Sequence, residues 1–175
     1  YCRSAHRFAR GPTYTAWSLG FRLALPGADD LPVLHLAFNE GTGSTARDSS
    51  GNGNDGTITN GPVWADGMHG GALSFDGTDD YVQVSSSPTL DGSAGLTVSF
   101  WLKPTDLLSS ASGRQELISR DLCWAINYDD VDGQLAFFCH SEDATVGGDN
   151  DGEARIYHPL QVEAGRWIHV AAIQD

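Results

Sequence analysis

Oxygen-bearing side chains and glycines are concentrated in residues 48–57, DSSGNGNDGT, where they suit either cation binding or tight turns. Asp48, Ser50 and Asn52 occupy positions one, three and five of an EF-hand-like loop. Position twelve of such a loop is a bidentate glutamate, but here it is Thr59 and no flanking helices are expected, so an EF-hand is excluded. The segment is therefore a calcium loop of another kind, a series of turns or a linker. Its Asn-Gly and Asp-Gly steps favour turns.

A second oxygen-rich stretch, GGDNDGE, contains Asp149, Asn150, Asp151 and Glu153. It follows an expected strand, and the loops of sandwich proteins often carry binding residues. Asp149 and Asp151 are therefore candidate ligand-binding residues. The alternative is a solvated loop that binds nothing.

Two aromatic residues could bind a sugar, because the C–H faces of sugars are apolar and stack on exposed rings. Trp101 shares a strand face with Ser99 and points away from Phe100, and Tyr81 is in phase with Gln83. The alternative is that a second layer or a loop covers both rings. Packing roles are expected for Trp64, Trp124 and Trp167, and structural roles inside strands for His35 and His169.

The sequence contains no recognisable catalytic motif. No Ser-His-Asp set stands in a nucleophile elbow, and no E-x-D-x-x-E run supplies paired carboxylates. No catalytic residue is assigned, and the chain is expected not to be an enzyme.

Charge is distributed unevenly along the chain. The net charge is -13, made of +4 in residues 1–25 and -17 in the rest. So acidic a domain repels phosphate backbones, which argues against nucleic acid as a partner. It suits cations or a neutral ligand such as a sugar, although acidic surfaces also simply keep secreted domains soluble.

Short alternating apolar runs continue from residue 33 to the C-terminus and predict an all-β fold. VLHLAFNE, GALSFDG, YVQVSS and LTVSFWLKP alternate with period two between Gly, Asp, Asn and Ser, as half-buried strands do. No segment keeps a helical period. Many short strands with turn signals predict an antiparallel two-sheet sandwich or jelly roll.

Cys123 and Cys139 flank WAINYDDVDGQLAFF, which has the pattern of a hairpin centred on Val131. A hairpin with this centre places Tyr128 opposite Gln134, Ile126 opposite Ala136, Trp124 opposite Phe138, and Cys123 opposite Cys139. Opposed residues in a non-hydrogen-bonded pair lie about 4.5 Å apart at Cα, which a disulfide can bridge. The sequence therefore predicts a cross-strand disulfide and an oxidising compartment, against the alternative of two buried thiols.

The two ends of the chain and its apolar runs give information on the cellular location of the protein. No run approaches the roughly 18 apolar residues of a membrane span, so none is expected. The chain has no initiator Met or signal-peptide pattern and stops inside the alternating run HVAAIQD. Both ends are interpreted as cuts in a longer protein.

The first segment contains CRSAHR, with Arg3 and Arg7, followed by Pro12 and LGFRLA. These features make residues 1–25 resemble the C-terminal end of the formylglycine-generating enzyme (sulfatase-modifying factor) family. Oxidases of that family use a copper-binding cysteine pair, but Cys2 is out of register with it, so the role is not carried over. Residues 26–32, PGADDLP, are expected to be a linker.

Residues 33–175 resemble a laminin-G-like, concanavalin A-like jelly roll that is incomplete at its C-terminus. The phrases DSSGNGNDG, GGALSFDGTDDYV and LTVSFWLKP carry the resemblance. Related jelly rolls often hold a structural calcium ion at a sandwich edge, partly through loop carbonyls. The resemblance therefore implies calcium, with Asp48, Asn52, Asn54 and Asp76 as candidate ligands.

The expected function follows from this resemblance and from the missing catalytic residues. It is a non-catalytic extracellular, cell-surface or periplasmic binding or adhesion module, calcium-stabilised, for a carbohydrate or a surface protein. One alternative is a structural appendage of a formylglycine-generating-enzyme-like oxidase whose active site lies upstream. Another is a spacer between domains.

Overall fold

The structure is a computed structural model, and the elements named in its described part are β-strands. It describes residues 6–10, 21–24, 32–87, 90, 95–105, 115–120, 123–129, 134–140, 153–158 and 163–174. Within these residues there is no α-helix, and all strand pairs are antiparallel. The predicted all-β sandwich is therefore confirmed.

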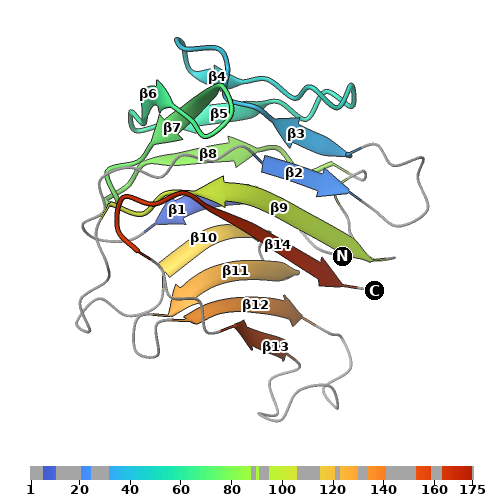
Figure 1. Cartoon of the computed structure of the whole chain (residues 1–175). Helices are drawn as coiled ribbons and strands as arrows, with labels where there is room; N and C mark the ends of the chain where they lie inside the picture. The colour runs from blue at the N-terminus through green and yellow to red at the C-terminus, as the bar shows by residue number, and fades with distance from the viewer. Residues whose placement is uncertain are drawn as a thin grey trace.

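The strands form two large sheets and one hairpin (Figure 1). The larger sheet has the order β13 (Glu153–His158), β12 (Gln134–His140), β11 (Trp124–Asp129), β10 (Gln115–Arg120), β1 (His6–Arg10), β8 (Tyr81–Val84), β5 (Gly56–Thr59) and β4 (Thr45–Ala46). The smaller sheet has the order β14 (Ile168–Gln174), β9 (Leu96–Leu102), β2 (Phe21–Ala24) and β3 (Leu34–Leu36). The separate hairpin consists of β6 (Val63–Asp66) and β7 (Gly71–Ser74).

One hydrophobic core joins the facing sides of the two large sheets. Strand β9 shows the cause, because its residues alternate between buried and partly exposed along its whole length. The side chains of Val98 and Phe100 enter the core, as expected, together with Val82 and Val84 of the larger sheet. Period-two alternation thus leaves Ser99 and Trp101 on the outer side of the smaller sheet.

The N-terminal segment contributes one strand to each large sheet. Strand β1 pairs with β8 and β10, and β2 pairs with β3 and β9. The sequence assigned residues 1–25 to a remnant of a different domain and residues 26–32 to a linker. That division stays a prediction, and residues 26–31 lie outside the described part of the chain.

The β11–β12 hairpin has a register one residue away from the expected one. Trp124 is opposite Cys139, and the last pair before the turn is Asp129 with Gln134. The expected direct opposition of Cys123 and Cys139 is therefore wrong. The length and type of the turn fix a hairpin's register, and DDVDG allows more than one turn, so the sequence could not select among them.

Cys123 directly precedes β11, is buried and is disulfide-bonded. The side chain of Cys139 lies outside the described side chains, so the Cys123–Cys139 pairing stays a prediction. Strand pairing keeps the two residues neighbours, because Cys139 is opposite Trp124, the residue after Cys123.

Candidate functional site: an aromatic cavity and two acidic loops

A cavity of about 430 Å³ lies on the outer side of the smaller sheet. Trp101 of β9 lines it and is partly exposed, as its phase in the strand predicted. The described residues around it are His35, Ala37, Asn39, Gly67, Met68, His69, Gly71, Ala72, Ser99, Phe100, Trp101, Trp167 and His169. The cavity therefore combines residues of β3, β9 and β14 with the β6–β7 hairpin.

The turn of the β6–β7 hairpin is held against the chain that follows β3. The backbone N–H of Gly71 donates to Oδ1 of Asn39 over 2.7 Å. A side chain could not stand at Gly71, because a Cβ there would lie 2.1 Å from the carbonyl oxygen of Phe38. Phe38 itself has a φ of 53°, a rare conformation for a bulky residue, and this bend brings Asn39 to the hairpin.

This close packing places His69, at the hairpin turn, beside Trp101. The ring centroids of His69 and Trp101 are 5.5 Å apart in an edge-on arrangement. His169 of β14 approaches the same indole, with ring centroids 5.0 Å apart. Trp101 is therefore flanked by two exposed imidazoles from separate elements.

The histidines around Trp101 differ in whether they have a hydrogen-bond partner. His35 is fixed, because its Nδ1 lies 2.9 Å from the hydroxyl of Ser49. The imidazoles of His69 and His169 make ring contacts with Trp101 but have no hydrogen-bond partner in the described part of the chain. They remain available to a ligand.

The sequence identified the indole of this cavity and missed its histidines. His169 was expected to be a structural residue inside a strand and Trp167 to be packed, but His169 is exposed and both line the cavity. The missed signal was the alternation of WIHVAAI, which sets His169 opposite in phase to the buried Val170. The expected cover over Trp101 is partial and comes from the turn at residues 67–71.

Tyr81, the other described candidate ligand residue, does not line the Trp101 cavity. Tyr81 is partly exposed and lies on β8 of the larger sheet, paired with Thr59. Asp149 and Asp151 lie outside the described residues. Their role in ligand binding stays a prediction.

The first acidic loop, residues 48–55, is a hydrogen-bonded turn organised by Asp48. The Asp48 carboxylate accepts hydrogen bonds from the backbone N–H groups of His35, Ser50 and Asn54, at 2.9–3.0 Å, and from the Ser50 hydroxyl at 2.8 Å. The side chains of Ser50, Asn52 and Asn54 all donate to the carbonyl of Val33. The predicted turn thus ties this loop to the start of β3.

These hydrogen bonds affect the pKa of the Asp48 carboxyl. Burial raises the pKa of its carboxyl, but the hydrogen bonds from His35, Ser50 and Asn54 outweigh burial and hold the pKa below its usual value. Its negative charge is therefore stabilised by donors of the protein itself.

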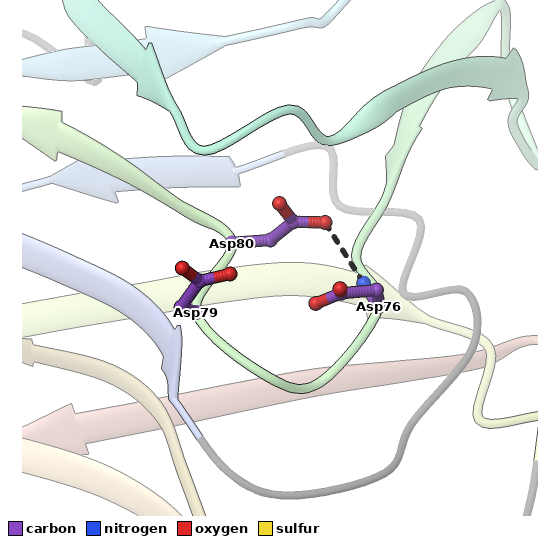
Figure 2. A group of neighbouring side chains, drawn as sticks. All are labelled: Asp76, Asp79 and Asp80. Atoms are coloured by element: carbon purple, nitrogen blue, oxygen red, sulfur yellow. Dashed lines mark hydrogen bonds between the residues drawn. The ribbon is translucent and has the colours of Figure 1, made fainter.

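The second acidic loop, residues 76–80, joins β7 to β8 and gathers three carboxylates (Figure 2). One carboxylate oxygen each of Asp76, Asp79 and Asp80 lies within 4.8 Å of the others. Asp80 is only 5% exposed, and its Oδ2 accepts a hydrogen bond of 2.9 Å from the Asp76 N–H. Asn60, with a φ of 66°, braces the loop by donating to the carbonyl of Asp79 over 2.7 Å.

The electrostatics of this loop are opposite to those of the first. Burial raises the pKa of Asp80, and the negative charges of Asp76 and Asp79 raise it further, against the one hydrogen bond from Asp76. The loop therefore carries negative charge that its own donors do not balance.

The two acidic loops stand at opposite ends of the β5–β8 strand pair. Asp55 adjoins Gly56, which is opposite Val84, whereas Asp80 adjoins Tyr81, which is opposite Thr59. Asp48, Asn52 and Asn54 are brought together in the first loop, but Asp76 belongs to the second. The four candidate calcium ligands thus do not form one cluster. The sequence could not show this separation, because a sequence alone does not say at which end of a sheet a loop lies.

Residues 76–175, more than half of the chain, match the laminin G-type family of the concanavalin A-like lectin/glucanases superfamily. The chain belongs to this superfamily. The match does not extend to residues 1–25, whose resemblance to formylglycine-generating enzymes stays a prediction. No curated protein and no solved structure gives a significant match to the chain.

Domains of this class are in general carbohydrate- or protein-binding modules rather than catalysts, and they are typically extracellular. Among the described segments, none is a helix of the length and apolarity that a membrane crossing requires.

Proposed function

We propose that this chain is a non-catalytic extracellular module that binds carbohydrate through the Trp101 cavity. The observation that carries the proposal is a partly exposed indole inside a cavity of about 430 Å³, bordered by polar groups from four elements. This volume lies within the range of small-ligand pockets.

The chemistry of the cavity suits a sugar ring. The apolar C–H face of a pyranose stacks on an indole, and its hydroxyls require hydrogen-bonding groups at the rim. Trp101 supplies the stacking surface, while Ser99, His69 and His169 supply polar atoms around it. Both flanking imidazoles restrict the orientation of the indole, which lowers the entropy lost on binding.

A glycan array followed by calorimetric titration of the best hit tests this proposal. We expect Trp101→Ala to weaken binding at least about tenfold, since stacking on one aromatic ring is commonly worth more than 1 kcal/mol. Tyr81→Ala is the matched control, because Tyr81 is a partly exposed ring on the other sheet. A loss of binding in Tyr81→Ala alone would move the site to the larger sheet, and an array without hits would refute sugar binding.

Calcium is the second part of the proposal. Carboxylate oxygens are the ligands that calcium prefers, and Asp76, Asp79 and Asp80 present three of them within 4.8 Å. Unbalanced charge at Asp80 supports a cation here, because a bound ion would stabilise a carboxylate whose pKa is raised by burial and by the charges of Asp76 and Asp79. The ion would stabilise the turn before β8, and waters and carbonyls would complete its six to eight ligands.

We further propose that the module is attached to a formylglycine-generating-enzyme-like domain through residues 1–25. A chain that starts at residue 32 tests this division by its thermal melt. An unchanged cooperative melt supports a separate N-terminal unit. A lost transition would instead make β1 and β2 integral strands of the sandwich, in keeping with their pairing in both large sheets.

A further inference from the structure

The Trp101 cavity has no acidic side chain among its described lining residues. This is unexpected for a chain with 23 Asp and Glu residues and a net charge of -13. Besides the two indoles, the polar side chains of the described lining are three imidazoles, one amide and one hydroxyl, from His35, His69, His169, Asn39 and Ser99. A ligand there meets no carboxylate from the described lining residues.

The groups that this lining leaves open can each donate a hydrogen bond. The Oδ1 atom of Asn39 already accepts the Gly71 N–H, so the amide offers its NH2 group. His69 and His169 have no hydrogen-bond partner in the described part of the chain, and each neutral imidazole carries one N–H. The second ring nitrogen of each imidazole is an acceptor, but the carboxylates that commonly bind the hydroxyls of neutral sugars are absent from the described lining.

We propose that the cavity selects a uronic acid, a sugar ring that carries one carboxylate. This inference rests on the proposed function, because it names the sugar class that the same cavity takes. The ring lies on Trp101, and the carboxylate accepts hydrogen bonds from His69 and His169. These two imidazoles approach the same indole from β14 and from the β6–β7 turn, so one substituent of a stacked ring can reach both.

The charge of the whole chain favours a uronate over a densely sulfated sugar. A net charge of -13 repels any polyanion, and at physiological ionic strength the repulsion is screened only beyond about 8 Å. A uronate carries one charge per ring, whereas a sulfated chain places several charges against the acidic surface around the cavity. The local absence of carboxylates offsets repulsion for the single charge only.

Titration calorimetry of the full chain with trigalacturonate and with its fully methyl-esterified form tests the inference. The two ligands share every ring atom and differ only at the carboxyl groups, which are charged in the acid and neutral and methylated in the ester. We expect the acid to bind about tenfold more tightly, since hydrogen bonds to a charged group are the stronger kind. A sulfated oligosaccharide of the same length is the third ligand, and it is expected to bind more weakly than the uronate.

Two variants test whether the imidazoles of His69 and His169 cause the preference for the acid over the ester. The double variant His69→Phe/His169→Phe keeps a ring beside Trp101 but removes the donors, and we expect acid and ester then to bind within about twofold of each other. His158→Phe is the matched control, because His158 is an exposed histidine on β13 of the larger sheet and should keep the tenfold preference.

Each outcome separates this inference from the proposed function. Equal binding of acid and ester by the unmodified chain, with Trp101→Ala weakening both, overturns the uronate inference and leaves carbohydrate binding in place. Tighter binding of the sulfated ligand also overturns it. No binding of any sugar here or on the array overturns both proposals.

Discussion

The two acidic loops of the larger sheet have similar compositions but opposite electrostatics. Both are Asp- and Gly-containing connections that lead into a strand. In residues 48–55, Asp48 accepts three backbone and one hydroxyl hydrogen bond, and its pKa is lowered. In residues 76–80, Asp80 accepts one bond from Asp76 and faces two further carboxylates, and its pKa is raised.

The comparison shows that composition does not decide whether an acidic loop needs a cation. A carboxylate surrounded by N–H donors already has its charge balanced, and such a loop is a turn. A buried carboxylate beside like charges is destabilised until a proton or a metal ion arrives. The more conspicuous motif, DSSGNGNDGT, is thus the self-contained loop, and the shorter FDGTDDY is the better candidate for the proposed calcium ion.

The largest effect is expected from Asp48→Asn, which replaces one acceptor oxygen by an NH2 group facing the Asn54 N–H. We expect the free energy of unfolding to fall by about 2 kcal/mol and the melting temperature by roughly 5 °C, allowing for the partial exposure of the site. Urea unfolding measures the change. Asp66→Asn on β6 is the control, because Asp66 is exposed, and an equal loss in both variants would contradict the special role of Asp48.

The second-largest effect is expected from calcium, which should stabilise the protein through one acidic loop and not through the other. At ten times its dissociation constant, the ion should raise the free energy of unfolding by about 1.4 kcal/mol relative to a chelated sample. We expect Asp76→Asn and Asp80→Asn to abolish this increase and Asp48→Asn to retain it from a lower starting stability. Thermal melts with calcium and with chelator give the answer. The reverse pattern would return the calcium site to residues 48–54, where the sequence first placed it.

The smallest effect is expected from Asp80→Asn in the absence of calcium. Removing one of three neighbouring charges should raise stability by roughly 0.5 kcal/mol, the scale of screened surface repulsion, while Asn still accepts the Asp76 N–H. This sign is opposite to that of Asp48→Asn at the same pH. A destabilised Asp80→Asn protein would show that the Asp80 charge is already balanced without a metal.

Acid titration sharpens the same contrast. The folded-state pKa of Asp48 is lowered, so its stabilisation is present above the ordinary value of 3.8 and is lost as the pH falls through the folded value. The folded-state pKa of Asp80 is raised, so its cost appears as the pH rises above 3.8 and is complete above the folded value. Unfolding of the unmodified chain and both variants between about pH 3 and 7 should therefore give difference curves of opposite sign.

Much of the fold followed from the sequence alone. Alternation in LTVSFWLKP fixed which side of β9 is buried, and hence that Trp101 faces outward, because side chains of a strand point to opposite faces in turn. Glycine and asparagine steps in residues 48–57 likewise predicted a turn, and the short-range hydrogen bonds of Asp48 are local in the chain. The register of β11 with β12 was not predictable, because several turns of slightly different length fit DDVDG.

The sequence by itself determined the strand faces and the outward indole, because each depends on residues a few positions apart. It favoured a turn at Asp48 but left a calcium loop or a linker open, and that turn also depends on His35, 13 positions away. Only the tertiary structure decided what surrounds them. His69 and His169 are separated by 100 positions in the chain, yet both contact Trp101. Sheet pairing also sent Asp76 to the opposite end of β5 and β8 from Asp48. Such neighbours are set by long-range strand order and register, which local patterns do not encode.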